Sequence, residues 1–148
     1  MSGSFVLERG SAPPPMVRLV LGADLDEAAK DALTAAVEAA ISAQPTTVLV
    51  EMSAITAYDP RLRGLLLALQ RVISAHRGRA VYVADRPRIR GLALWVIHMA
   101  EDKEAKIVGN VAAAVEWLRG SEERVAAAER GTFAALARLS GAQGGDPR

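Results

Sequence analysis

Few side chains of this 148-residue chain could carry out covalent chemistry. It contains no cysteine, which excludes a thiol nucleophile, a thiolate metal site, a disulfide framework and CxxC redox chemistry. The two histidines, His76 and His98, lie on different expected helices. His98 and Glu101 have the spacing of helical metal ligands, but no second histidine accompanies them, so we expect no metal site.

Acidic residues form two further groups that catalysis could use. Asp24, Asp26 and Glu27 could be an acid–base set, but they precede an apolar-periodic segment, a position typical of helix capping. Asp59 lies near Tyr58 and Thr56, and the three make a weak candidate for a cluster that activates a nucleophile. No GxxxxGK[ST] or GxGxxG motif is present, so no phosphate-binding loop is indicated. We therefore expect no catalytic residue, no cofactor and no enzymatic activity.

Charge is distributed unevenly along the chain. The net charge is +1, yet the segment from Arg61 to Arg90 has eight arginines and one acid, Asp85, a net of +7. Such a charge distribution can orient a protein toward an acidic protein or a phosphate. Alternatively, these arginines are simply exposed to solvent. Proteins that bind nucleic acid by stacking its bases on aromatic side chains need several such residues. The segment has one, Tyr82, so no nucleic-acid partner is expected.

The longest apolar run, Gly91 to Ala100, is shorter than the roughly 20 residues of a membrane span, and His98 interrupts it. The N-terminal MSGSFVLERG has neither the basic start nor the long apolar run of a signal peptide. We expect a cytoplasmic protein without membrane insertion.

Hydrophobic periodicity predicts the elements that position these residues. Strands are expected at residues 4–9, 16–21, 47–52, 80–84 and 106–108, and helices between residues 24 and 44, at 60–76, at 87–99 and from 111 to about 119. Asp59 and Pro60 suit the start of the second helix, Asn110 can cap the fourth, and Gly120 can end it. Strands alternating with helices predict an α/β fold, a mixed β-sheet of about five strands with four to five α-helices, plus an extra C-terminal helix.

The chain divides into three parts by composition. Residues 1–120 are expected to be one domain, residues 121–140 a helical extension with a thin alanine-rich stripe, and residues 141–148 a disordered tail. The extension could pack on the domain, mediate a homodimer or bind a partner helix.

Four strings in this order resemble the STAS domain, the fold of bacterial anti-sigma factor antagonists, over about residues 4–119. They are VRLVLGADLD, TVLVEMSAITAYD, RGRAVYVADRPRIRGLALWVIHMAED and KIVGNVAAAVEWL. In that family the central strand leads to Asp-Ser-Ser-Gly-Leu-Gly, whose first serine accepts phosphate from a partner kinase. The resemblance implies a non-enzymatic regulator of transcription that binds an anti-sigma factor or ATPase-like kinase, or another STAS-like protein.

The chain departs from the family at that motif. Asp59 and Gly64 match, but Pro60 stands at the phosphoacceptor position, Arg61 replaces the second serine and Leu62 the middle glycine. Pro60 is therefore a degenerate phosphosite, and we expect a binder that is not switched there. The predicted partner-binding residues are Tyr58, Asp59, Pro60, Arg61, Arg63 and Gly64.

Two alternatives stay open. Ser53 and Thr56 supply other hydroxyls in the loop and could be phosphoacceptors. The resemblance also allows a scaffold or accessory subunit of a signalling assembly or of a lipid-transport ABC complex. In that role a missing phosphoacceptor is easier to explain.

Overall fold

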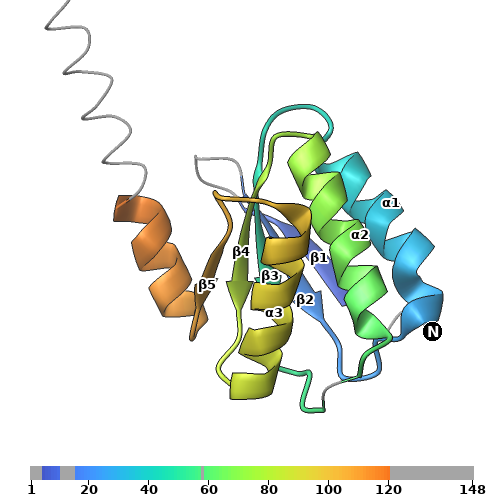
Figure 1. The fold of residues 1–148 in the computed structure, drawn as a ribbon. Helices are drawn as coiled ribbons and strands as arrows, with labels where there is room; N and C mark the ends of the chain where they lie inside the picture. The colour runs from blue at the N-terminus through green and yellow to red at the C-terminus, as the bar shows by residue number, and fades with distance from the viewer. Residues whose placement is uncertain (1–4, 11–15, 58, 121–148) are drawn as a thin grey trace, which may run out of the picture. The chain divides into compact units, whose positions relative to one another are not determined.

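The computed structural model describes residues 5–10, 16–57 and 59–120. Two compact units divide the chain, the first ending at Ala114 and the second beginning at Val115. The elements of the first unit are β1 (Phe5–Arg9), β2 (Met16–Leu21), the 3-10 helix η1 (Glu27–Ala29), α1 (Lys30–Ile41), β3 (Thr47–Glu51), α2 (Leu62–Ala75), β4 (Arg79–Val83), α3 (Pro87–Ala100) and β5 (Lys106–Val108) (Figure 1). This order confirms the predicted α/β class.

The strands form one mixed sheet in the order β1-β2-β3-β4-β5. β1 is antiparallel to β2, and the other neighbours are parallel. The register places Glu51 beside Val83, and Val83 beside Val108, so the parallel strands end together at one edge of the sheet. The loops that lead into α2 and α3 leave from this carboxyl edge.

Helices α1, α2 and α3 lie side by side over one face of the sheet (Figure 1). Their apolar stripes pack on alternate strand residues, among them Val48, Val50 and Ala80, in one core cluster. On the opposite face, Leu49 and Val81 are buried as well. Burial on both faces explains why β3 and β4 consist of unbroken apolar runs instead of alternating ones.

The first helix begins later than its acidic residues suggest. Asp26 supplies the cap, because its Oδ1 accepts the backbone N–H of Ala28 at 3.1 Å, and η1 follows it. α1 starts only at Lys30 and ends at Ile41, four residues before Pro45.

The segment after β5 is helical over residues 111–120. Asn110 caps it as predicted, since its Oδ1 accepts the backbone N–H of Ala113 at 2.7 Å. The prediction that Gly120 ends the helix is wrong, because Gly120 is itself helical. No glycine in the described ranges has a positive φ, so Gly120 is a tolerated helical residue and not a left-handed stop. The predicted extension, residues 121–140, and tail, residues 141–148, lie outside the described residues.

A polar network that runs from the core to the surface ties α2 to β4 and to the loop after α3. The hydroxyl of Tyr82 donates to Gln70 Oε1, and Gln70 Nε2 donates to Asp102 Oδ2 at 2.6 Å. Ser74 Oγ donates to the same Asp102 oxygen at 3.0 Å, while Asp102 Oδ1 accepts the N–H of Glu104 at 2.8 Å. Burial raises the pKa of the Tyr82 hydroxyl, so it stays a donor. Apolar periodicity does not reveal this network.

Candidate functional site

The loop from β3 to α2 lies at the carboxyl edge of the sheet and is held there by two contacts. Met52 donates its N–H to Val83 O at 2.9 Å, which extends the β3–β4 ladder by one bond. In addition, Arg86 Nη1 donates to Ser53 O at 3.0 Å, which joins the start of α3 to this loop. Ile55 is buried within the loop. The two loops at this edge thus form one connected surface.

Asp59 organises the start of α2. Its Oδ1 accepts the backbone N–H of Arg61 at 3.0 Å and faces Arg61 Nε at 3.2 Å. These bonds, the backbone one first, hold the pKa of Asp59 below its ordinary value, and the same carboxylate raises the pKa of the Arg61 guanidinium. The sequence predicts Asp59 as the helix cap, and the structure shows it capping a turn whose helix proper begins at Leu62.

An internal carboxylate therefore occupies the place where an anion would meet the free amides before α2. Helix starts attract anions through unpaired N–H groups and the helix dipole. Here Asp59 accepts a hydrogen bond from one such amide, that of Arg61, and also pairs with the Arg61 guanidinium. The guanidinium of Arg61 is thus half of an exposed ion pair, with 76% of the Arg61 side chain open to solvent.

The structure separates the two arginines that the sequence groups together. Pro60, Arg61 and Gly64 are exposed at the start of α2. Arg63 turns to α3 instead, where its guanidinium carbon lies 5.3 Å from the ring centroid of Trp95, a cation–π distance. Tyr58, the remaining predicted residue, lies outside the described residues. Trp95 is a site residue that the sequence places only on an apolar helix stripe.

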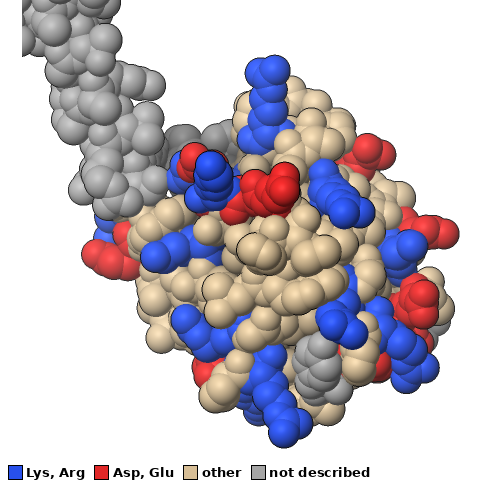
Figure 2. All heavy atoms as spheres, viewed as in Figure 1, with Lys and Arg blue, Asp and Glu red and all other residues tan. Residues whose placement is uncertain are grey.

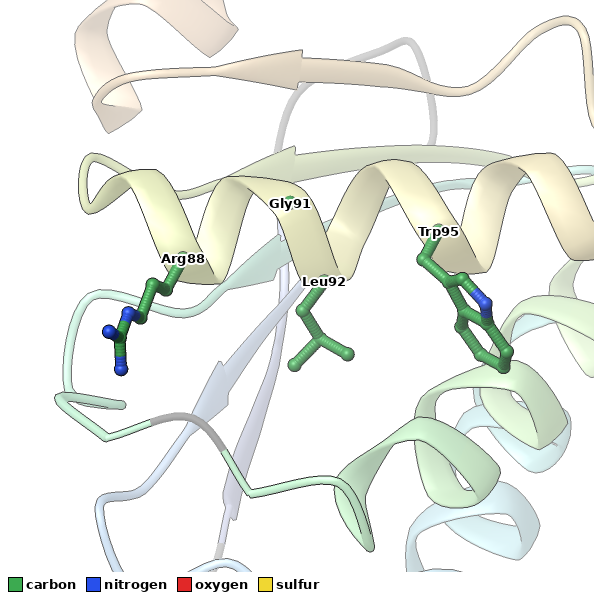
Figure 3. Close-up of a pocket in the computed structure, with 4 residues that line it drawn as sticks. All are labelled: Arg88, Gly91, Leu92 and Trp95. Carbon is green, nitrogen blue, oxygen red and sulfur yellow. The ribbon is translucent and has the colours of Figure 1, made fainter.

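A hollow of about 380 Å³ adjoins this stacked pair. It is lined by Arg88, Gly91, Leu92 and Trp95 of α3. Figure 3 shows the Arg88, Leu92 and Trp95 side chains pointing to the same side of α3, toward the loop before α2 and α2 itself. The predicted site and this hollow are therefore neighbours on one face.

Basic residues gather at the start of α3, and acidic residues lie past its end. Arg86, Arg88 and Arg90 occupy the first turns, and Glu101 and Asp102 follow the last one. Figure 2 shows blue side chains over the lower end of α3 and red ones near its upper end. The arginines at the starts of α2 and α3 thus lie at the carboxyl edge of the sheet, whereas Arg71, Arg77 and Arg79 of the same segment lie toward the other end, near the start of β4.

Two of the other candidate chemical groups have structural partners. His76 Nε2 lies 3.0 Å from Glu38 Oε2, which joins α2 to α1. Asp26 caps η1. No group of three or more His, Cys, Asp or Glu residues that could hold a metal ion occurs among the described residues. No helix in the described ranges is long and apolar enough to cross a membrane.

Comparison with known proteins gives matches only at the level of structure. No protein-family model and no curated protein matches the chain. The anti-sigma factor antagonist SpoIIAA in its unphosphorylated form superposes with a TM-score of 0.56 at 19% identity, over 78% of this chain and 97% of SpoIIAA. The chain has the STAS fold.

Two further solved structures agree with this fold. An anti-sigma-factor antagonist (STAS) domain protein from Planctomyces limnophilus has a TM-score of 0.52 at 14% identity, covering 74% of this chain and 96% of its own. The protein TM1081 has a TM-score of 0.51 at 14% identity, covering 77% and 89%. The fold implied by the sequence resemblance is therefore confirmed.

Proposed function

We propose that this STAS-fold protein is a non-enzymatic regulator that acts by binding another protein. The docking surface consists of Tyr58, Asp59, Pro60, Arg61, Arg63 and Gly64. The observation that carries the proposal is the exposed start of α2, with Pro60, Arg61 and Gly64 open at the carboxyl edge of a fold shared with SpoIIAA. The proposed partner is an anti-sigma factor or ATPase-like kinase, or another STAS-like protein, in a bacterial cytoplasm.

The proposed binding is constitutive with respect to the family's phosphorylation position. Pro60 has no hydroxyl, so no phosphate can be esterified there. In addition, Asp59 already places a carboxylate on the amide and guanidinium of Arg61. A phosphate adds about −1.5 to −2 charge at pH 7, and an exposed Ser53 or Thr56 remains the alternative acceptor in this loop.

Affinity capture from the native cell, with and without ATP, tests this function. We expect the wild-type chain to retain an anti-sigma factor, an ATPase-like kinase or another STAS protein in both conditions, because no switch operates at Pro60. Arg61→Glu should lose that protein, and Lys30→Glu, a charge reversal at an exposed position of α1, should keep it. Recovery of none of these protein classes by the wild-type chain would count against the proposal.

A second candidate function is a scaffold or accessory subunit of a signalling assembly or lipid-transport ABC complex. Pro60 at the phosphoacceptor position favours it, since such a subunit needs no phosphorylation switch. Co-purification with a permease and its ATPase would select this function over transcription control. A homodimer is compatible with either function, and sedimentation of the purified chain measures it.

A further inference from the structure

Gly91 lies in the middle of a helix without a reason inside the fold. It is the fifth residue of α3, it is exposed, and a Cβ built on it meets no heavy atom within 4 Å. Its φ is not positive, so alanine would fit the same backbone. Because glycine costs a helix stability relative to alanine, folding does not account for the missing side chain at this point.

The charges of α3 also oppose helix stability. The helix has no acidic residue in its first turn, where the dipole favours acids, and arginines stand there instead. Arg86 and Arg90 donate to backbone carbonyls, of Ser53 and Ala84 respectively. Arg88 is exposed and lines the hollow. A helical glycine and arginines in the first turn both oppose helix stability, and several such unfavourable residues at one place are typical of functional sites.

The hollow combines an apolar lining with a positive border. Trp95 and the edge of Leu92, whose side chain is otherwise buried in the core, are its apolar lining residues, and a Cβ at Gly91 would meet no heavy atom within 4 Å (Figure 3). Arg88 borders it directly, and Arg63 stacks on the Trp95 ring beside it. An apolar group that enters here is surrounded by guanidinium groups, which favour carboxylates on the same ligand.

We propose that this hollow receives one large apolar side chain of a partner protein, from a segment whose neighbouring residues are acidic. The apolar side chain packs on the half-buried Trp95 in the space that Gly91 leaves free, and the flanking carboxylates face Arg88 and Arg63. This inference rests on the proposed protein-binding function and names the chemistry of the partner segment at one end of the docking surface.

Selection from a random peptide library displayed on phage tests the inference with the full chain as bait. We expect the enriched sequences to carry one leucine, isoleucine, phenylalanine or methionine with aspartate or glutamate within one helical turn of it. Synthetic peptides of the enriched sequence are then titrated into the chain while the fluorescence of Trp95 and Trp117 is followed. A Trp95→Phe chain identifies the part of the signal that belongs to the hollow.

Gly91→Leu is the decisive variant, because it fills the hollow from within the chain. We expect it to weaken peptide binding by at least about tenfold, a loss of about 1.4 kcal/mol. We expect it also to raise the thermal midpoint, since it removes a helical glycine. Ala39→Leu adds a comparable side chain to an exposed position of α1 and should leave binding unchanged. A rise in midpoint together with a loss of binding separates occlusion of a site from damage to the fold.

Enriched peptides that are basic or lack an apolar residue would overturn the inference, as would a failure of the library to enrich. Equal binding of the peptide to the Gly91→Leu chain would overturn it too. Competition of the peptide by inorganic phosphate alone would show an anion site without an apolar anchor, which also contradicts it. If Gly91→Leu keeps the natively captured partner while Arg61→Glu loses it, this inference fails and the proposed function stands. If the wild-type chain captures no regulatory protein, the proposed function itself fails.

Discussion

At the scale of single residues, Asp59 and Arg63 show how neighbours in one motif take different roles. Asp59 holds the turn before α2 through the backbone and guanidinium of Arg61. Arg63, two residues further on, leaves the turn and stacks on Trp95 of α3. The proposed docking surface therefore contains one arginine that is paired with Asp59 and one that is oriented by an aromatic ring.

Asp59→Asn should make the stability of the protein less dependent on pH in the acidic range. The folded-state pKa of Asp59 is lowered, so its contribution is present above the unfolded-state value of about 3.9 and is lost as the pH falls through the lower folded value. We expect the variant to unfold at a lower temperature than wild type at pH 7 and the difference to shrink in acid. Thermal unfolding at both pH values measures this, and Asp85→Asn, which removes another exposed carboxylate, is the control.

Arg63→Ala should cost stability as well as binding. Its cation–π contact with Trp95 is worth about 0.5–1 kcal/mol at a partly exposed site. Arg71→Ala removes the same side chain from an exposed position of the same helix and should have a smaller effect. Urea denaturation of the two variants compares the free energies of unfolding. Equal values would mean that the stacked arrangement contributes nothing in solution.

At the scale of elements, α2 and α3 combine a buried face with an exposed one that serves the site. Leu66 and Leu69 of α2 are fully buried in the core cluster, as members of the apolar stripe of this helix. On α3, by contrast, Leu94 is 60% exposed and Met99 46% exposed. The sequence alone does not show which apolar residues of α3 are exposed, because they occur on nearly every side of this helix.

Leu66→Ala should destabilise the protein by roughly 2–5 kcal/mol, the range for a leucine removed from a well-packed core. Leu66 has no exposed surface, so its loss leaves a cavity between α2 and the sheet. Leu94→Ala is the matched control, and its effect should stay within about 0.5 kcal/mol because the side chain is mostly exposed. Chemical denaturation reports both. Similar costs for the two leucines would contradict the assignment of the helix faces.

Tyr82→Phe tests the polar network between α2 and β4. The change leaves Gln70 Oε1 without its donor inside the core, which should cost about 1–3 kcal/mol. The same substitution should cost much less in a Gln70→Met background, where no polar atom is left unpaired. A double-mutant cycle of unfolding free energies measures the difference. Additive effects would show that the two side chains do not depend on each other.

At the scale of the whole molecule, charge polarity should control the rate at which a partner associates. The segment from Arg61 to Arg90 carries a net of +7 while the whole chain carries +1. Salt of about 1 M shortens the Debye length to about 3 Å from about 10 Å at 0.1 M. We therefore expect the association rate of the captured partner to fall steeply over this range and its dissociation rate to change less. Surface plasmon resonance measures both rates. An association rate independent of salt would place the contact outside the arginine-rich area.

Much of the architecture follows from the amino-acid sequence because its causes are local. Alternating and helical apolar periods depend on neighbours within a few residues, so the order of strands and helices, a capping acid before the first helix and the cap by Asn110 could be predicted. The absence of a hydroxyl at Pro60 is also evident from the sequence. The ends of helices and strands are harder to predict from the sequence. The helix expected from residue 60 starts at Leu62, since Asp59 stabilises a separate turn before it.

Only the tertiary structure decided which distant residues meet. Gln70 and Asp102 are 32 positions apart, yet they share a hydrogen bond beside Tyr82, and Arg63 finds Trp95 on the next helix. These contacts depend on how α2 and α3 lie across the sheet, and no local period encodes that arrangement. The same holds for the hollow at Gly91, since a glycine in the sequence does not say whether a neighbouring side chain fills the space beside it.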